Sequence, residues 1–242
     1  MGVIEILSSR REYTKLNPLV VLLGKGDHQI TSSWTDQYGD ENETSIVITR
    51  SNITFLGNGK DTTTILGGFR IVNQENITFK NMTVTNTSGG GNGIFMRSAK
   101  VELIDVALKG CAFAALYITN VFSETTVVAT RCEFANSGHI YTDGYGAVVQ
   151  GSLTSATFKN CVFHDNSSDG IFVSQSAIHL HGAATAIHSN ERHGLAAWSS
   201  AKVIIHLPSH HNTVYNNEGE DRKTSSGGTI TNGEDLRYQV IF

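Results

Sequence analysis

A short phrase recurs along this chain, and it constrains the fold more than any other feature of the sequence. The phrase is a glycine followed by two apolar residues. It occurs at 93–95, 146–148, 170–172 and 194–196, so that the last two intervals are 24 residues each. A repeat of this length is one supersecondary unit, which cannot bury its apolar face alone. Stacked copies can bury it, because each inward position then continues through the whole protein. The repeat therefore predicts a solenoid.

Apolar residues form a second series in the same repeats. Runs that alternate between apolar and polar residues, such as 178–180, predict short strands with one buried face. The series, at intervals of 24 to 29 residues, consists of Val84, Leu108, Phe134, Phe163, Ile187 and Val214. Cys132 and Cys161 each lie two residues before a member of the series. We expect them and Cys111 to be small core residues, because three well-separated cysteines suit neither a disulfide framework nor a zinc site.

Asparagine marks one turn of most repeats. It follows the apolar series at Asn86, Asn136, Asn166, Asn190 and Asn217. Asparagine tolerates left-handed backbone geometry, and a stacked column of amides can hydrogen-bond from one turn of a solenoid to the next. We expect these asparagines to do both.

These patterns predict one all-β domain over residues 1–242, a single-stranded parallel β-helix of about eight to nine rungs. The rungs are expected over 19–217, with a polar loop at 31–44 between the first two. Residues 1–18 are expected to form an N-terminal cap with a short helix at 3–13, which would close the open end of the stack. Residues 218–242 are expected to form a C-terminal cap or tail.

Composition and charge exclude several classes of function. The formal net charge of −4 supplies no general basic field for nucleic-acid phosphates. No stretch of 18 apolar residues is present to span a membrane, and the first residues lack the pattern of a signal peptide, so the sequence indicates no compartment. No glycine-rich phosphate loop precedes a helix, and we expect no nucleotide or other cofactor.

Two passages carry a resemblance to a known family. Residues 52–68 and the repeated Asn-x-x-x-Gly phrase at 166–171 and 190–195 resemble the pectin-lyase-like right-handed parallel β-helix superfamily, over about residues 19–217. The resemblance implies a right-handed coil. It implies no single activity, because that superfamily includes lyases, hydrolases, esterases and epimerases of acidic polysaccharides as well as phage tailspikes and adhesins.

The residues that precede the repeat glycines form one column in space if the rungs stack about 4.8 Å apart. This column brings together a phenol, a carboxylate and an imidazole, those of Tyr145, Asp169 and His193. In a polysaccharide lyase or epimerase, such groups remove a proton from the sugar and return one. Arg192 lies beside the column and could neutralise a uronate carboxylate. These four residues are the candidate catalytic set.

Other residues near this edge are candidates for binding a substrate. The insertion between 136 and 146 adds His139, Tyr141 and Asp143. Trp198 is an aromatic residue that could stack on the apolar face of a sugar ring. The competing interpretation is structural, because polar residues are ordinary at exposed turns and outward aromatic residues cover the edges of a core.

The sequence predicts no metal site. The adjacent carboxylates that bind calcium in pectate lyases are not evident, and the Asn-Thr-Asp, Asp-Asp and Gly-His-Gly motifs of polygalacturonases are missing. His181 and His206 align with Lys159 across rungs, and a pair of imidazoles at this spacing can bind a transition metal. Outward ladders of this kind are more often solvated surface, so we expect no metal here.

Two classes of function remain open from the sequence. We expect a β-helix that presents an extended surface to a polysaccharide or a protein, or that assembles as a fibre-like homo-oligomer such as a trimer. The alternative is an enzyme acting on uronate-containing glycans, a lyase or C5-epimerase that uses the candidate catalytic set. A glycoside hydrolase is less favoured, because it needs two carboxylates across one groove.

Overall fold

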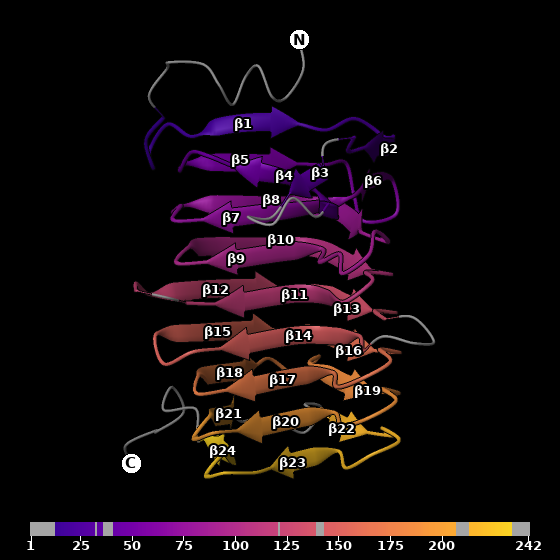
Figure 1. The fold of residues 1–242 in the computed structure, drawn as a ribbon, viewed down its shortest axis with the longest axis vertical. Coiled ribbons are helices and arrows are strands. Elements are labelled where there is room, and N and C mark those ends of the chain that lie inside the picture. The colour runs from indigo at the N-terminus through magenta and orange to yellow at the C-terminus, as the bar shows by residue number, and fades with distance from the viewer. Residues whose placement is uncertain are drawn as a thin grey trace, which may run out of the picture.

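The computed structural model of this chain is built from β-strands (Figure 1). It describes residues 13–31, 33–35, 41–120, 122–138, 143–206 and 213–233. No helix occurs in these ranges, so they contain none that is long and apolar enough to cross a membrane. The helix expected at 3–13 lies outside the described residues except for its last position.

One sheet is nine-stranded and takes a strand from each successive turn of the coil. Its parallel strands are β4 (Glu41–Ile48), β7 (Gly68–Val72), β9 (Ile94–Arg97), β11 (Ala114–Thr119), β14 (Tyr145–Gln150), β17 (Ile171–Ser174), β20 (Leu195–Trp198) and β23 (Arg222–Thr224). The remaining strand, β3 (Ser33–Thr35), pairs antiparallel with β4 through an irregular register. The loop expected over 31–44 is therefore wrong for residues 33–35 and 41–44, which form this antiparallel pair, and residues 32 and 36–40 lie outside the described residues.

A fifteen-stranded sheet forms the rest of the coil as two arms. The first arm consists of β1 (Leu19–Leu22), β5 (Ile53–Leu56), the first halves of β8 (Ile77–Thr85) and β10 (Lys100–Lys109), β12 (Thr125–Thr130), β15 (Thr154–Lys159), β18 (Ala177–His181), β21 (Lys202–His206) and β24 (Thr229–Gly233). The second arm consists of β2 (Gly26–Gln29), β6 (Thr63–Leu66), the second halves of β8 and β10, β13 (Glu133–Ala135), β16 (Val162–His164), β19 (Ala186–His188) and β22 (Thr213–Tyr215). The strands of both arms pair in parallel, which confirms the all-β class and the parallel β-helix.

The last two strands extend the coil beyond residue 217. β23 pairs in parallel with β20, and β24 pairs in parallel with β21. Part of the segment expected to be a cap or tail therefore supplies two further strands of the stack (Figure 1).

The chain bends between the two arms at a residue with left-handed backbone geometry. The angle φ is 53–56° at this position in four successive turns, at Asn81, Asp105, Arg131 and Asn160. Arginine has no intrinsic preference for this geometry. Its guanidinium is anchored to the preceding turn, where Nε and Nη2 of Arg131 lie 2.8 and 2.6 Å from the two carboxylate oxygens of Asp105.

The apolar series predicted from the repeat is a continuous column of the core. Its members pair residue by residue in successive strands, from Val84 through Leu108, Phe134, Phe163 and Ile187 to Val214. Phe134 and Phe163 stack with their ring centroids 4.5 Å apart and their planes 7° from parallel. The three cysteines are buried free thiols, as expected. Spacing in the sequence therefore predicts contacts between turns correctly.

At the asparagine turn, two neighbouring residues share the two roles that we expected of one asparagine. One residue has the left-handed backbone geometry, and the next one forms the hydrogen-bonded ladder. Left-handed φ angles of 53–56° occur at Asn136, Asp165, Ser189 and Asn216. The following residues form the ladder, in which Nδ2 of Asn166 donates to Oδ1 of Asn190 at 2.8 Å and Nδ2 of Asn190 donates to Oδ1 of Asn217 at 2.8 Å. The predicted alignment is wrong by one residue at Asn136, because Ser137 takes the ladder position and donates its backbone N–H to Oδ1 of Asn166.

The ladder explains the glycine of the repeated phrase. A β-carbon on Gly170 would lie 2.7 Å from Cγ2 of Ile187 and 2.8 Å from Nδ2 of Asn190. Both distances are too short for packed side chains, so a glycine is required where the strand begins beside the ladder. Asn86 uses its amide within its own turn, where Nδ2 donates to the carbonyl oxygen of Asn92 at 2.9 Å.

Asn190→Ala is expected to lower the free energy of unfolding by about 2–4 kcal/mol, because it leaves several buried hydrogen-bonding groups without a partner. Asn190 is fully buried, and its Oδ1 accepts hydrogen bonds from both the backbone N–H and the Nδ2 of Asn166. Urea unfolding followed by circular dichroism measures the change. Asn232→Ala, at an exposed asparagine of the terminal strand β24, is the control and should change stability by less than about 0.5 kcal/mol. Equal effects of the two substitutions would contradict a stabilising ladder.

Candidate functional site

The outward face of the nine-stranded sheet carries a line of aromatic side chains, which we call the aromatic stripe. Its members are partly exposed and are Phe95, Phe113, Tyr117, Tyr145, Phe172 and Trp198. Alternation along the strands places Phe95, Tyr117, Phe172 and Trp198 outside, whereas Phe113 directly precedes β11 and Tyr145 is the first residue of β14. Ile94 in β9 and Ile171 in β17 are fully buried, so the next residue of each strand, a phenylalanine, projects from the opposite face.

Neighbouring rings of the stripe are in contact across successive turns. In the order Phe95, Tyr117, Phe113, Tyr145, Phe172 and Trp198, successive ring centroids are 5.5, 5.9, 5.5, 6.0 and 6.4 Å apart. These separations lie within the range of aromatic pair contacts. The stripe crosses the strands from β9 to β20 and therefore runs along the axis of the coil (Figure 1).

Cationic side chains lie along the stripe. Arg70 pairs in register with Phe95, and its Cζ lies 4.3 Å from the centroid of that ring. Arg97 follows Phe95 by two residues and therefore projects from the same face. Lys223 is opposite Ala196 in the register at the far end, where its ammonium pairs with Glu220. Two guanidinium groups are thus concentrated at the β7–β9 end of the stripe.

The structure brings the four candidate catalytic residues to one edge of this sheet. Backbone hydrogen bonds between successive turns form their column: the N–H of Gly146 donates to the carbonyl oxygen of Asp169 at 3.2 Å, and the N–H of the next repeat glycine donates to that of His193 at 2.8 Å. Burial raises the pKa of the Tyr145 phenol, and the nearby carboxylates of Asp143 and Asp169 raise it further. Tyr145 therefore belongs both to this set and to the aromatic stripe.

The carboxyl group of Asp169 is part of a buried turn. Asp169 is 1% exposed, and its Oδ1 accepts a hydrogen bond of 3.0 Å from the backbone N–H of His193. Burial raises the pKa of this carboxyl group, while the His193 amide and the Arg192 guanidinium act in the opposite direction. The side chain therefore joins one turn of the coil to the next.

The backbone also holds the imidazole of His193. The N–H of Glu220 donates to its Nδ1 at 3.0 Å. A ring nitrogen that accepts such a bond carries no proton, so the neutral ring has its proton on Nε2 and is a donor there. In this tautomer the ring has no free lone pair with which to take a proton from a sugar.

The candidate substrate-binding residues have different positions. His139 and Tyr141 lie outside the described residues, and Asp143 is exposed. Trp198 is the last residue of β20 and belongs to the aromatic stripe. Phe95 and Phe172 are not among the residues predicted from the sequence. The signal for them is the repeated phrase itself, because alternation from the buried residue after each glycine turns the next one outward.

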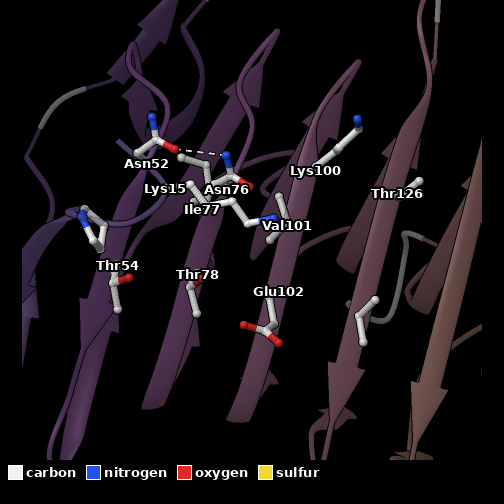
Figure 2. A pocket seen from close by; sticks show the side chains of 12 residues that line it. Lys15, Asn52, Thr54, Asn76, Ile77, Thr78, Lys100, Val101, Glu102 and Thr126 are labelled. Carbon is white, nitrogen blue, oxygen red and sulfur yellow. Dashed lines mark hydrogen bonds between the residues drawn. The ribbon is translucent and has the colours of Figure 1, made fainter. Parts of the chain in front are cut away.

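The first arm of the fifteen-stranded sheet has a hollow of about 380 Å³ on its outward face (Figure 2). Thr54, Thr78 and Glu102 line it from neighbouring strands, and at its edge Nδ2 of Asn76 donates to Oδ1 of Asn52 at 2.9 Å. Glu102 is the one carboxylate among the described residues that line it. This hollow therefore does not supply the pair of carboxylates that a glycoside hydrolase needs.

Comparison with known proteins agrees with this architecture. The family model described as "Right handed beta helix region" matches residues 42–229. A pectate lyase from a Bacillus species, solved in complex with trigalacturonate, is 12% identical and superposes with a TM-score of 0.61, covering 98% of this chain and 84% of its own. A pectin methylesterase variant in complex with a hexasaccharide is 11% identical, with a TM-score of 0.53 over 97% of this chain and 89% of its own. At these identities the likeness shows the fold alone. No curated protein matches the sequence.

Asp169→Asn is expected to make the free energy of unfolding less dependent on pH. Because burial raises the native pKa of this carboxyl group, the native state holds a proton that the unfolded state releases. The free energy of unfolding of the wild type is therefore lowered by the cost of ionising Asp169 in the native state. This cost is absent below the unfolded pKa and grows as pH rises from the unfolded pKa through the native pKa. Asparagine keeps the oxygen that accepts the His193 hydrogen bond, so the variant should be at least as stable as wild type at neutral pH. Urea unfolding from about pH 3 to about pH 8 measures the difference.

Asp105→Asn is the matched control and has the opposite sign. The hydrogen bond from Arg131 lowers the pKa of Asp105, so its contribution to stability is present above the unfolded pKa and is lost as pH falls through the native pKa. This variant should lose stability at neutral pH and lose less on acidification than wild type. A loss of stability in Asp169→Asn at neutral pH would contradict an unfavourably ionised Asp169.

Proposed function

Because the chain belongs to the right-handed β-helix family, we propose that it binds an extended acidic glycan along the aromatic stripe. The observation that carries the proposal is the stripe itself, in which partly exposed aromatic rings contact one another across the nine-stranded sheet. Contiguous apolar patches on a protein surface mark interaction sites, whereas single exposed apolar residues do not.

A glycan chain fits this surface in shape. Pyranose rings present apolar CH faces, which stack on aromatic rings, and a polar rim that stays in water. Neighbouring strands are about 4.8 Å apart, a spacing comparable with one sugar unit of an extended chain. Rings from successive turns can therefore meet successive sugars. Aromatic side chains also lose little conformational entropy on binding, because they have only two rotatable bonds.

The arginines beside the stripe favour an acidic glycan. Guanidinium pairs with carboxylate through two parallel hydrogen bonds, and Arg70, Arg97 and Arg192 all lie near the rings. The formal net charge of the chain is −4, so the attraction has to come from these local contacts and not from a long-range field. The two solved neighbours support a glycan ligand, since one was solved with trigalacturonate, which is acidic, and the other with a hexasaccharide.

The hydrogen bonds and burial of the candidate catalytic residues favour a glycan-binding protein over an enzyme. The carboxyl of Asp169 is buried within a turn, and Nδ1 of His193 accepts a backbone hydrogen bond. A lyase or C5-epimerase is the second candidate, because Tyr145 stands on the stripe with a raised pKa and within electrostatic range of Arg192. A phenol placed in this way could donate a proton to a departing sugar oxygen.

Trp198→Ala and Phe172→Ala are each expected to weaken binding of oligogalacturonate about 2- to 12-fold, the equivalent of an aromatic contact of about 0.5–1.5 kcal/mol. Isothermal titration calorimetry measures the affinity, and thermal unfolding checks that each variant is folded. Phe122→Ala is the matched control, because Phe122 is 92% exposed and lies outside the stripe. Unchanged affinity in both stripe variants would exclude the stripe as the binding site.

Arg97→Gln separates the contribution of charge from that of stacking. It is expected to weaken binding of oligogalacturonate and to leave binding of a neutral cello-oligosaccharide unchanged, because only the uronate presents a carboxylate to the guanidinium. Lys202→Gln, on the fifteen-stranded sheet, is the control for a general loss of positive charge. Equal affinity of the wild-type chain for the two glycans would contradict an acidic ligand. New ultraviolet absorbance from unsaturated uronate ends, or deuterium incorporation at C5, would establish the enzyme instead.

A further inference from the structure

Three imidazoles meet on the outward face of the fifteen-stranded sheet, away from the aromatic stripe. In β18 the residues Ile178 and Leu180 are buried, so His179 and His181 project outward. In β21 the same alternation turns His206 outward, next to His181 in the register. All three histidines are partly buried.

The three rings converge closely. Nδ1 of His179 lies 2.9 Å from Nε2 of His206, and the rings of His181 and His206 stack with centroids 3.9 Å apart and planes 11° from parallel. One nitrogen atom from each of the three rings lies within 4.8 Å of the other two. The strand that follows places Gly233, which has no side chain, opposite His206 in the register.

We propose that His179, His181 and His206 bind a divalent transition-metal ion of the Zn²⁺, Cu²⁺ or Ni²⁺ class. Imidazole nitrogen is a preferred ligand of these ions. With metal–nitrogen bonds of about 2.0–2.1 Å, two ligands of a tetrahedral ion lie roughly 3.3 Å apart. The facing nitrogens of His179 and His206 are 2.9 Å apart and all three nitrogens lie within 4.8 Å of one another. A rotation that unstacks the rings of His181 and His206 would aim the three lone pairs at one ion. From the sequence only His181 and His206 align, and His179 supplies the third ligand by a diagonal approach between strands.

The short contact between His179 and His206 indicates how the ion would enter. Two ring nitrogens 2.9 Å apart share one proton, which one carries and the other accepts. A metal ion takes the place of that proton, because each nitrogen then offers its lone pair to the ion. The displaced proton moves to the other nitrogen of the same ring, so both facing nitrogens become available while each imidazole stays neutral.

The described strands around the cluster carry lysines and no carboxylate, so nitrogen is the ligand that they offer. Lys159 is opposite His181 on β15, and Lys202 lies on β21. The described strands β15, β18, β21 and β24 contain no aspartate or glutamate. Calcium and magnesium, which require oxygen ligands, are therefore not expected to bind here.

Titration of the full chain, without a polyhistidine tag, tests the site. ZnCl₂, CuCl₂ and NiCl₂ should each bind, with Cu²⁺ the tightest, and CaCl₂ should not. His181→Gln and His206→Gln should each weaken binding more than about tenfold, since even the outer-shell partners of a metal change its affinity by that factor. Electron paramagnetic resonance of the Cu²⁺-loaded chain should show coupling to imidazole nitrogens.

The control is His188→Gln. His188 is also an outward histidine in a stack, 5.3 Å from His164 between ring centroids, and it lies outside the cluster. The His188→Gln variant should bind the metal ion as tightly as wild type does. The Lys159→Gln variant should bind it at least as tightly as wild type, because the substitution removes a repelling cation. Equal affinity in wild type and in a variant lacking all three histidines would overturn the proposal. Glycan binding should be unchanged in that variant, so the outcome is independent of the function proposed for the aromatic stripe.

Discussion

Parallel backbone pairing between successive turns is the constraint on which the rest of this structure depends. Neighbouring strands lie about 4.8 Å apart, so the neighbours of a residue are set by its place in the repeat and not by its distance along the chain. The unbroken register from Val84 to Val214 shows this in the core. The asparagine ladder, the aromatic stripe and the histidine cluster follow from the same rule, because each brings together residues from successive turns.

Stacking of the turns also allows each outward face of the coil to present a different kind of side chain. The aromatic stripe occupies the nine-stranded sheet, and the three histidines occupy the first arm of the fifteen-stranded sheet. Inward positions of both sheets contribute to one core, whereas the outward positions of the two sheets lie on different faces of the coil. A coil of this kind can therefore present a long row of rings to an extended ligand on one face and a compact group of nitrogens on another.

Burial decides which titratable groups are available for chemistry. Tyr145, Asp169 and His193 share one column, but they do not share one environment. The Asp169 carboxyl and Nδ1 of His193 are both engaged by backbone N–H groups, whereas the Tyr145 ring is partly exposed among other aromatic rings. A column of suitable residue types is therefore not by itself an active site. A row of aromatic rings can contact a ligand only because the rings are exposed.

The sequence by itself determined the fold class, the core column and the buried thiols, because a period of about 24 residues and strict alternation decide which side chains face inward. It also placed the candidate catalytic residues in one column. Only the tertiary structure decided that the ladder passes through Ser137 and not Asn136, that Asp169 is buried, and that His179 reaches His206. These features depend on the length of each turn and the rotamer of each side chain, which are set by packing against the neighbouring turns and leave no trace in a periodic pattern.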